Sequence, residues 1–300
     1  MALARDVETP PGLGAAARGE LRRVVDYYNS TLLQYWAFWV GRTDLAMHLG
    51  YHDETGRPHS EALLRMNAVL SRLGGVCAAD RLLDAGCGYG GTTLWLAEHV
   101  GCRATGITIV PYQADRARRA AERRRLGSRV SFHVEDYART SFASSSFDVI
   151  WGLESVVHAP DKQAFVRESA RLLRPRGRLL ISEYMLRSSP PLSSGERAFL
   201  EPWLEGWAMP SLLTSREYED AVRRAGLAAA RTHDLTEAIL PSSRRLERVA
   251  SWFLPLGRLL RAAGVIGQPE LANIVATVRQ GEALRRGLWR YVVLVAEKPA

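Results

Sequence analysis

Short apolar runs and longer amphipathic segments follow one another along the middle of the chain. The apolar runs predict strands at 81–86, 103–110, 129–136, 147–154, 176–184 and 289–298. The segments between the early runs have apolar positions at helical spacing and predict helices at about 91–100, 112–126 and 161–173. Strands that alternate with helices build a largely parallel sheet covered on both faces. The pattern therefore predicts a doubly wound α/β core over residues 76–185, with a last core strand in 288–300.

The N-terminal quarter has a different pattern, in which aromatic residues crowd a helical stretch. Residues 1–19 contain the turn sequence ETPPG and are expected to form a frayed arm. Six aromatic residues then lie between positions 21 and 49, and apolar positions at helical spacing over 59–74 end at a glycine pair. We expect residues 1–75 to form a flexible arm and a helical lid.

The region from 186 to 287 lacks a second series of strand and helix units. Seven prolines divide it into short helical pieces, and only the segment at 214–227 is expected to return to the core. We predict a mostly helical cap that is inserted before the last core strand.

Composition narrows the class of protein. With 300 residues and 47% apolar composition, the chain can bury a large core. No apolar run approaches the roughly 20 residues of a membrane-spanning helix, and the first twenty residues lack the apolar centre of a signal peptide. Three cysteines without close pairing suggest reduced thiols and no structural metal. These features predict a cytoplasmic protein without membrane insertion.

The formal net charge of +8 raises the question of a nucleic-acid partner. Almost every basic residue is arginine, with Lys162 and Lys298 as the only lysines, a bias expected from a GC-rich genome. No recognition motif or basic stripe interleaved with aromatic residues accompanies the charge, so no nucleic-acid partner is predicted.

The glycine-rich stretch LLDAGCGYGG, at 82–91, follows the first predicted strand. Gly86, Gly88 and Gly91 match the spacing G-x-G-x-x-G, which lets the backbone approach a ligand at the C-terminal end of a strand. A dinucleotide-binding fold would show the same spacing. Two features disfavour NAD: Asp84 precedes the turn, and the strand at 103–110 ends in GITIV rather than in an acidic residue.

Four motifs in order resemble those of the class I S-adenosylmethionine-dependent methyltransferases. They are DAGCGYGG at 84–91, EDY at 135–137, FDVIWGLES at 147–155 and LLRPRGRLLISE at 172–183. The resemblance covers roughly 75–185, and the run at 289–298 fits the antiparallel last strand of such folds. It implies a Rossmann-like seven-stranded sheet with S-adenosylmethionine as the cofactor.

The resemblance also implies which residues hold the methyl donor. The turn formed by Gly86, Cys87 and Gly88 would contact the amino-acid end of the donor, with Asp84 nearby. The acidic segment after the third strand would place Asp136 near the adenine, flanked by Glu135 and Tyr137.

One departure from the common pattern concerns the ribose site. Many members of the family have an acidic residue at the end of the second strand, whereas this chain has Thr108 followed by Gln113. The pattern is similar to that of cyclopropane-fatty-acid synthases and sterol methyltransferases, so we expect donor binding to be retained.

The segment GLESVVHAPDK brings two candidate catalytic residues after the fourth strand. Glu154 and His158 are four residues apart, a spacing that would place both on one face of a helical turn. The segment resembles E-x-x-x-H-A-P-D of sterol C-methyltransferases and a similar motif of natural-product methyltransferases. An alkene acceptor would need Glu154 for the carbocation and its proton, whereas a hydroxyl or amine acceptor would use His158 as base. Structural roles remain open, with Glu154 accepting backbone hydrogen bonds and His158 acting as a cap.

Residues outside the core are candidates for acceptor binding. Aromatic faces could stabilise a cation, and HLGYHDE at 48–54 resembles a lid segment of the same branch. The predicted acceptor-binding residues are Tyr28, Trp36, His48, Tyr51, Trp151 and Trp207. Arg244 and Arg245 could bind an anionic head group, although a solvated helix start is the preferred explanation.

Together these features predict a small-molecule methyltransferase, with C-methylation of an isoprenoid double bond as the preferred reaction. The alternative within the family is O- or N-methylation of a natural product. A donor-binding module without catalysis and an NAD-dependent oxidoreductase are the other classes. Magnesium is expected only with a diphosphate acceptor, no metal site is predicted, and a homodimer is left open.

Overall fold

The computed structural model describes residues 15–39, 44–53 and 58–300. Seven strands form one sheet in the order β3-β2-β1-β4-β5-β7-β6. Their bounds are β1 Arg81–Ala85, β2 Arg103–Thr108, β3 Val130–Val134, β4 Phe147–Leu153, β5 Leu173–Leu186, β6 Ala228–Asp234 and β7 Trp289–Glu297. β7 is antiparallel to both β5 and β6, and the other neighbouring strands are parallel. The predicted α/β fold with a seven-stranded sheet is confirmed.

Helices cover both faces of the sheet. One face packs against α3 (His59–Leu73), α4 (Gly91–Trp95) and α5 (Pro111–Arg123). The other face packs against α6 (Lys162–Leu172) and α8 (Ser215–Arg224). A π-helical turn, η2 (Leu96–Val100), continues α4, and a 3-10 turn, η3 (Val156–His158), follows β4. Two apolar clusters, one on each face, form the core of a doubly wound fold.

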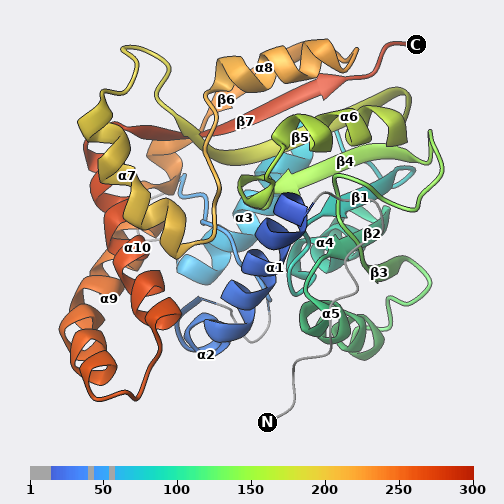
Figure 1. Cartoon of the computed structure of the whole chain (residues 1–300). Coiled ribbons are helices and arrows are strands. Elements are labelled where there is room, and N and C mark those ends of the chain that lie inside the picture. Colours follow the sequence, from blue (N-terminus) through green and yellow to red (C-terminus); the bar gives the residue numbers. More distant parts are fainter. Residues whose placement is uncertain (1–14, 40–43, 54–57) are drawn as a thin grey trace.

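The N-terminal and cap helices extend the apolar cluster on the face of α3, α4 and α5. The first group is α1 (Ala15–Ser30), α2 (Leu32–Gln34) and the π-helical turn η1 (Tyr35–Trp39). The second is α7 (Ser194–Gly206), α9 (Thr236–Ala262) and α10 (Gln268–Arg285), which gather at one side of the molecule away from α5 (Figure 1). None of the described helices combines the length and apolar composition needed to cross a membrane.

The strand β6 lies inside the region that the sequence predicts as mostly helical cap. Its sequence, AAARTHD, lacks the apolar alternation of a half-buried strand. β6 lies at the edge of the sheet, where it pairs with β7, and such a strand does not need that alternation. The preceding α8 packs on the sheet, as expected for the segment 214–227. Within 186–287 the cap helices are therefore α7, α9 and α10.

Close contact between α7 and α10 fixes the position of the cap. Gly206, the last residue of α7, lies so near α10 that an added Cβ would be 2.5 Å from the carbonyl oxygen of Ala272 and 2.7 Å from Ala276 Cβ. Neither neighbour can yield easily, since one is helix backbone and the other is a methyl group fixed to it.

We expect Gly206→Ala to lower the free energy of unfolding by roughly 1–3 kcal/mol, because it overpacks the contact between α7 and α10. The matched control is Gly195→Ala near the other end of α7, where an added Cβ meets nothing within 4 Å. This change should be neutral or stabilising by at most about 1 kcal/mol. Urea denaturation of the two variants measures both values, and equal stabilities would contradict the packing argument.

Candidate active site

A cavity lies at the C-terminal ends of β1, β2 and β4, where a parallel sheet places its ligands. The turn after β1 forms one wall, with Gly86 at φ +92° and Gly88 at φ +53°, in the left-handed region that favours glycine. An added Cβ at Gly86 would lie 2.3 Å from Ser155 Cβ, so only glycine allows the turns after β1 and β4 to meet.

The segment before α3 forms the opposite wall. An added Cβ at Gly91, the first residue of α4, would lie 2.4 Å from the carbonyl oxygen of Asp44. Met47 Sδ would lie 3.0 Å from an added Cβ at Gly88. Residues 44–49 therefore lie directly over the glycine-rich turn. We call residues 44–53 the lid segment.

Several predicted donor-binding residues lie in the cavity wall, namely Asp84, Gly86, Cys87, Gly88, Thr108, Gln113 and Tyr137. Asp84 is buried and accepts a hydrogen bond of 2.6 Å from Thr93 Oγ1, and burial raises the pKa of its carboxyl to about 7. Thr108 Oγ1 donates to Gln113 Oε1 at 2.8 Å. Thr108 and Gln113 thus act as a bonded pair at the end of β2.

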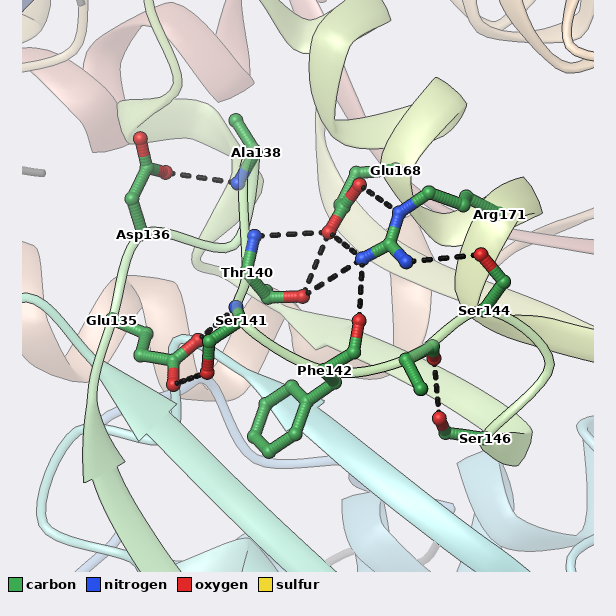
Figure 2. A network of polar contacts seen from close by, with 11 residues as sticks. Glu135, Asp136, Ala138, Thr140, Ser141, Phe142, Ser144, Ser146, Glu168 and Arg171 are labelled. Atoms are coloured by element: carbon green, nitrogen blue, oxygen red, sulfur yellow. Dashed lines mark hydrogen bonds and ion pairs between the residues drawn. The ribbon is translucent and has the colours of Figure 1, made fainter. Parts of the chain in front are cut away.

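The acidic segment at 135–137, which follows β3, was expected to line the donor site. Of its three residues only Tyr137 belongs to the cavity wall, and its hydroxyl donates to the carbonyl oxygen of Ser155 at 3.0 Å. Figure 2 shows the Glu135 carboxylate bound to Ser141 and one oxygen of Asp136 bound to the amide of Ala138. Both carboxylates hold the turn that follows β3, so their predicted place beside adenine stays a prediction.

Glu154 binds three segments of the chain at once. Its Oε1 accepts hydrogen bonds of 2.7 Å from the amide of Leu49 and from the Tyr291 hydroxyl, and its Oε2 accepts one from the Tyr184 hydroxyl. The residue has φ +49° and is partly buried. Burial raises the pKa of its carboxyl to about 7, against the opposing effect of the three donors.

His158 faces the same cavity from the end of η3. Its Nδ1 lies 3.2 Å from the carbonyl oxygen of Ala208, which can only accept, so Nδ1 carries the proton. Its Nε2 then accepts a hydrogen bond of 2.9 Å from the Tyr28 hydroxyl on α1. Burial lowers the pKa of His158 to about 4, and the imidazole is neutral at pH 7.

A second, smaller cavity adjoins the first, and both share Tyr28, Met47, Glu154 and His158 as wall residues. Its remaining wall is largely aromatic and is made by Tyr27, Tyr35, Val157, Tyr184, Trp207 and Met209. We call it the aromatic chamber. Its position beside the glycine-rich turn and its apolar rings suit an acceptor molecule.

The predicted acceptor-binding residues do not all meet at this chamber. Tyr28 and Trp207 line it, and His48 lines the first cavity. Trp151 is fully buried in the core on β4, because its side chain points into the sheet's packed face. Trp36 packs on Tyr89 outside both cavity walls, with ring centroids 5.1 Å apart.

The other residues predicted for acceptor binding also lie outside the two walls. Tyr51 belongs to the lid segment, and its amide donates to the carbonyl oxygen of Ala62 at 2.9 Å. Arg244 and Arg245 are exposed on α9.

Sequence reasoning missed the residues that hold the two catalytic candidates. Tyr184 and Tyr291 are strand residues, and nothing in their pattern separates them from core tyrosines. Glu183 is fully buried, and its Oε1 accepts hydrogen bonds from the amides of Ser155 and Val156 at 2.9 and 2.6 Å. The only available signal was an acidic residue inside an otherwise apolar strand.

Comparison with known proteins identifies the family. A family model described as "Methyltransferase domain" matches residues 83–181. The chain is 30% identical over 280 residues to the methyltransferase GfsG of Streptomyces halstedii, covering 93% of this chain and 95% of that protein. The chain belongs to the class I S-adenosylmethionine-dependent methyltransferases.

Two further relatives are methyltransferases by name. The 27-O-demethylrifamycin SV methyltransferase of Amycolatopsis mediterranei is 34% identical over 197 residues, covering 65% of this chain and 71% of that protein. The chloroplastic tocopherol O-methyltransferase of Arabidopsis thaliana is 28% identical over 296 residues, covering 92% and 82%.

Solved structures of the same fold agree. A geranyl diphosphate C-methyltransferase from Streptomyces coelicolor A3(2) superposes with a TM-score of 0.71 at 20% identity, covering 95% of this chain and all of that chain. A cyclopropane synthase from Mycobacterium tuberculosis superposes with a TM-score of 0.75 at 15% identity, covering 98% of this chain and all of that one. At these identities the similarity shows the fold.

The cavity of this methyltransferase fits the donor of its family. Gln113 Nε2 and His48 Nε2 are buried in the wall and have no hydrogen-bond partner among the residues that the structure describes. Buried polar atoms without partners are costly, and a polar ligand would satisfy them. Within the described ranges, no group of three or more His, Cys, Asp or Glu side chains is arranged to hold a metal ion.

The raised pKa of Glu154 has a consequence for stability. The native state binds this proton more readily than the unfolded state between pH 4.5 and about 7, so the contribution of Glu154 to the free energy of unfolding falls as pH rises through that range. Glu154→Gln should make this decline shallower in chemical denaturation series. The exposed carboxylate of Glu201 provides the control Glu201→Gln, which should leave the slope unchanged. A Glu154→Gln slope equal to that of the wild type would refute the assignment.

Proposed function

We propose that this enzyme methylates a hydroxyl group of a hydrophobic natural product, with His158 as the base. The observation that carries the proposal is the arrangement of His158. Its Nδ1 is engaged by Ala208, its Nε2 lone pair points to the Tyr28 hydroxyl in the wall shared by both cavities, and its pKa lies near 4. Because the imidazole is uncharged at neutral pH, Nε2 can take a proton from an acceptor hydroxyl that displaces the Tyr28 hydroxyl.

The chemistry follows from this placement. The donor, when bound, supplies an electrophilic methyl group on a sulfonium sulfur. The acceptor hydroxyl takes the place of the Tyr28 hydroxyl at His158 Nε2 and gives its proton to that nitrogen as its oxygen bonds to the methyl carbon and the carbon–sulfur bond breaks. The aromatic chamber orients the acceptor and excludes water.

Residues of the first cavity are proposed to hold the donor. The turn of Gly86, Cys87 and Gly88 would lie along its amino-acid end together with Asp84. Gln113 Nε2, which lacks a hydrogen-bond partner in the described part of the chain, would donate to a ribose hydroxyl beside Thr108. His48 Nδ1 donates to the carbonyl oxygen of Leu49 at 3.0 Å, so His48 Nε2 would accept a hydrogen bond from the same ligand.

The names of two relatives support the proposed class of reaction. The tocopherol enzyme and the demethylrifamycin enzyme both methylate oxygen, and the first spans most of this chain. The predicted cytoplasmic location and the homodimer stay predictions.

C-methylation of an isoprenoid double bond is the second candidate. Five aromatic residues of the chamber surround the carboxyl of Glu154, whose pKa of about 7 suits proton removal. However, both oxygens of Glu154 already accept hydrogen bonds from Leu49, Tyr184 and Tyr291. Magnesium would enter only with a diphosphate acceptor.

The direct test is incubation of the enzyme with trideuteromethyl-labelled donor and two acceptor pools, followed by mass spectrometry. One pool holds prenylated phenols and macrocyclic alcohols, and the other holds prenyl diphosphates and sterols. We expect label on oxygen in the first pool. The assignment of His158 as the base would be contradicted if the second pool gave a product with the label on a new carbon–carbon bond and the first pool gave none.

The dependence of kcat/KM on pH separates the two bases. If His158 is the base, kcat/KM stays level from about pH 8 to pH 5 and falls only as His158 gains a proton near its pKa of about 4. If Glu154 is the base, kcat/KM already falls below its pKa of about 7. His158→Ala should lower kcat roughly 10²–10⁴-fold. The control Tyr28→Phe removes only the hydroxyl that the acceptor replaces, so its kcat should remain within a few-fold of wild type.

A further inference from the structure

A third cavity, of about 290 Å³, lies between α9, α10 and the start of η1, outside the two cavities of the active site. Its wall is largely aliphatic and includes Val249, Phe253, Leu256, Leu260, Ile266 and Ile274. We call it the α9–α10 groove. Phe253 is 40% exposed and Leu256 47% exposed, so the groove presents apolar surface to water. Such a surface on a monomer commonly marks a binding site.

The groove and the aromatic chamber share one wall residue, Tyr35. The Tyr35 hydroxyl lies 2.8 Å from the Tyr27 hydroxyl, and Tyr27 donates to Asn273 Oδ1 at 2.9 Å. Tyr27 faces the chamber and Asn273 faces the groove. A single layer of side chains therefore separates the two spaces.

The Tyr35 side chain is the part of this layer that can move aside. Tyr35 begins the π-helical turn η1, a less regular backbone than the α-helix before it. If the Tyr35 side chain turns away, Tyr27 keeps its hydrogen bond to Asn273, and Asn273 keeps its bond of 2.8 Å to Gln34. Movement of Tyr35 would join the chamber and the groove without leaving these partners unpaired.

The sizes of the two spaces indicate what the groove holds. The chamber measures about 30 Å³, far less than the groove, and it adjoins the reacting nitrogen of His158. A hydrophobic acceptor larger than a small ring needs further apolar space next to the chamber. The groove is an apolar space of this kind, and Tyr35 lies between it and the chamber.

We propose that the α9–α10 groove binds the apolar chain of the acceptor, an alkyl or prenyl tail, while Tyr35 moves aside to connect the groove with the chamber. The proposal rests on the proposed function, since the hydroxyl end of the same acceptor lies at His158. It assigns the choice of acceptor to α9 and α10, two helices whose residues are not among those that line the donor cavity.

Binding is measured first, because it does not depend on turnover. The probe is N-phenyl-1-naphthylamine, a neutral aromatic whose fluorescence rises in apolar sites, added to the full-length enzyme. Val249→Trp fills the groove from α9 and should weaken probe binding at least tenfold. Leu259→Trp adds the same side chain at a position on α9 that is 66% exposed and outside the groove wall, and it should bind within twofold of wild type.

Competition by 4-alkylphenols, from ethyl to octyl, tests the chain itself. In the wild type and in Leu259→Trp, displacement of the probe should strengthen by about fourfold for each added methylene group. In Val249→Trp this gain should end at short chains. Ile274→Phe fills the groove from α10 and replaces Val249→Trp if that variant fails to fold.

Methyl transfer to the same phenols completes the test. We expect kcat/KM to rise with chain length in the wild type and to stay level in Val249→Trp, with phenol itself methylated equally by both. Chain-length-dependent binding without any methylated phenol would contradict the proposed function and leave the groove assignment standing. Equal probe binding by Val249→Trp and the wild type would overturn the groove assignment. A wild-type dimer that becomes a monomer in Val249→Trp would also overturn it, because the groove would then be a contact between two copies of the chain.

Discussion

One carboxyl group, that of Glu154, joins the parts of this enzyme that have to meet at the active site. Its three hydrogen-bond donors come from the lid segment, from β5 and from β7. Its own amide donates to the carbonyl oxygen of Ser182 on β5 at 2.9 Å. A carboxylate removed from water requires such donors, and the donors here come from segments that are far apart in the sequence. Backbone amides of residues 50–52 also donate hydrogen bonds to α3 and α9, so the position of the lid segment depends on the sheet and on both helices.

A second buried carboxyl group fixes the other catalytic candidate. Glu183 accepts hydrogen bonds from the amides that begin η3, the turn that ends at His158. Burial, and next the nearby charge of Glu154, raise the pKa of Glu183 to about 8. Adjacent strands thus supply two acidic groups with separate structural tasks. One holds the lid segment and the other holds the histidine.

The sequence predicts where the core strands lie along the chain and where the glycine-rich turn follows the first of them, because both depend on local patterns. Gly86 and Gly88 lie in the left-handed region that their motif requires. The sequence does not predict the edge strand β6, since an edge strand needs no apolar alternation. Tyr184 and Tyr291 are not predicted either: each looks like a core tyrosine until the fold brings its hydroxyl to Glu154, and the residues of the second contact are 137 positions apart. Trp151 was predicted to bind the acceptor but is buried in the core, because an aromatic residue within a motif can still point away from the cavity.

Glu154 and His158 line the same cavities, as their spacing suggested, but not because they share one face of a helical turn. A helical turn would place both side chains on one face, but Glu154 precedes the turn at φ +49° and only Val156–His158 are helical, in a 3-10 turn. The left-handed residue directs the carboxyl toward β5 and β7, whereas the 3-10 turn directs the imidazole toward α1 and the loop at Ala208. Both groups border the same two cavities from different sides. Two residues of one motif therefore have separate tasks: the carboxyl anchors the lid segment, and the imidazole faces the aromatic chamber.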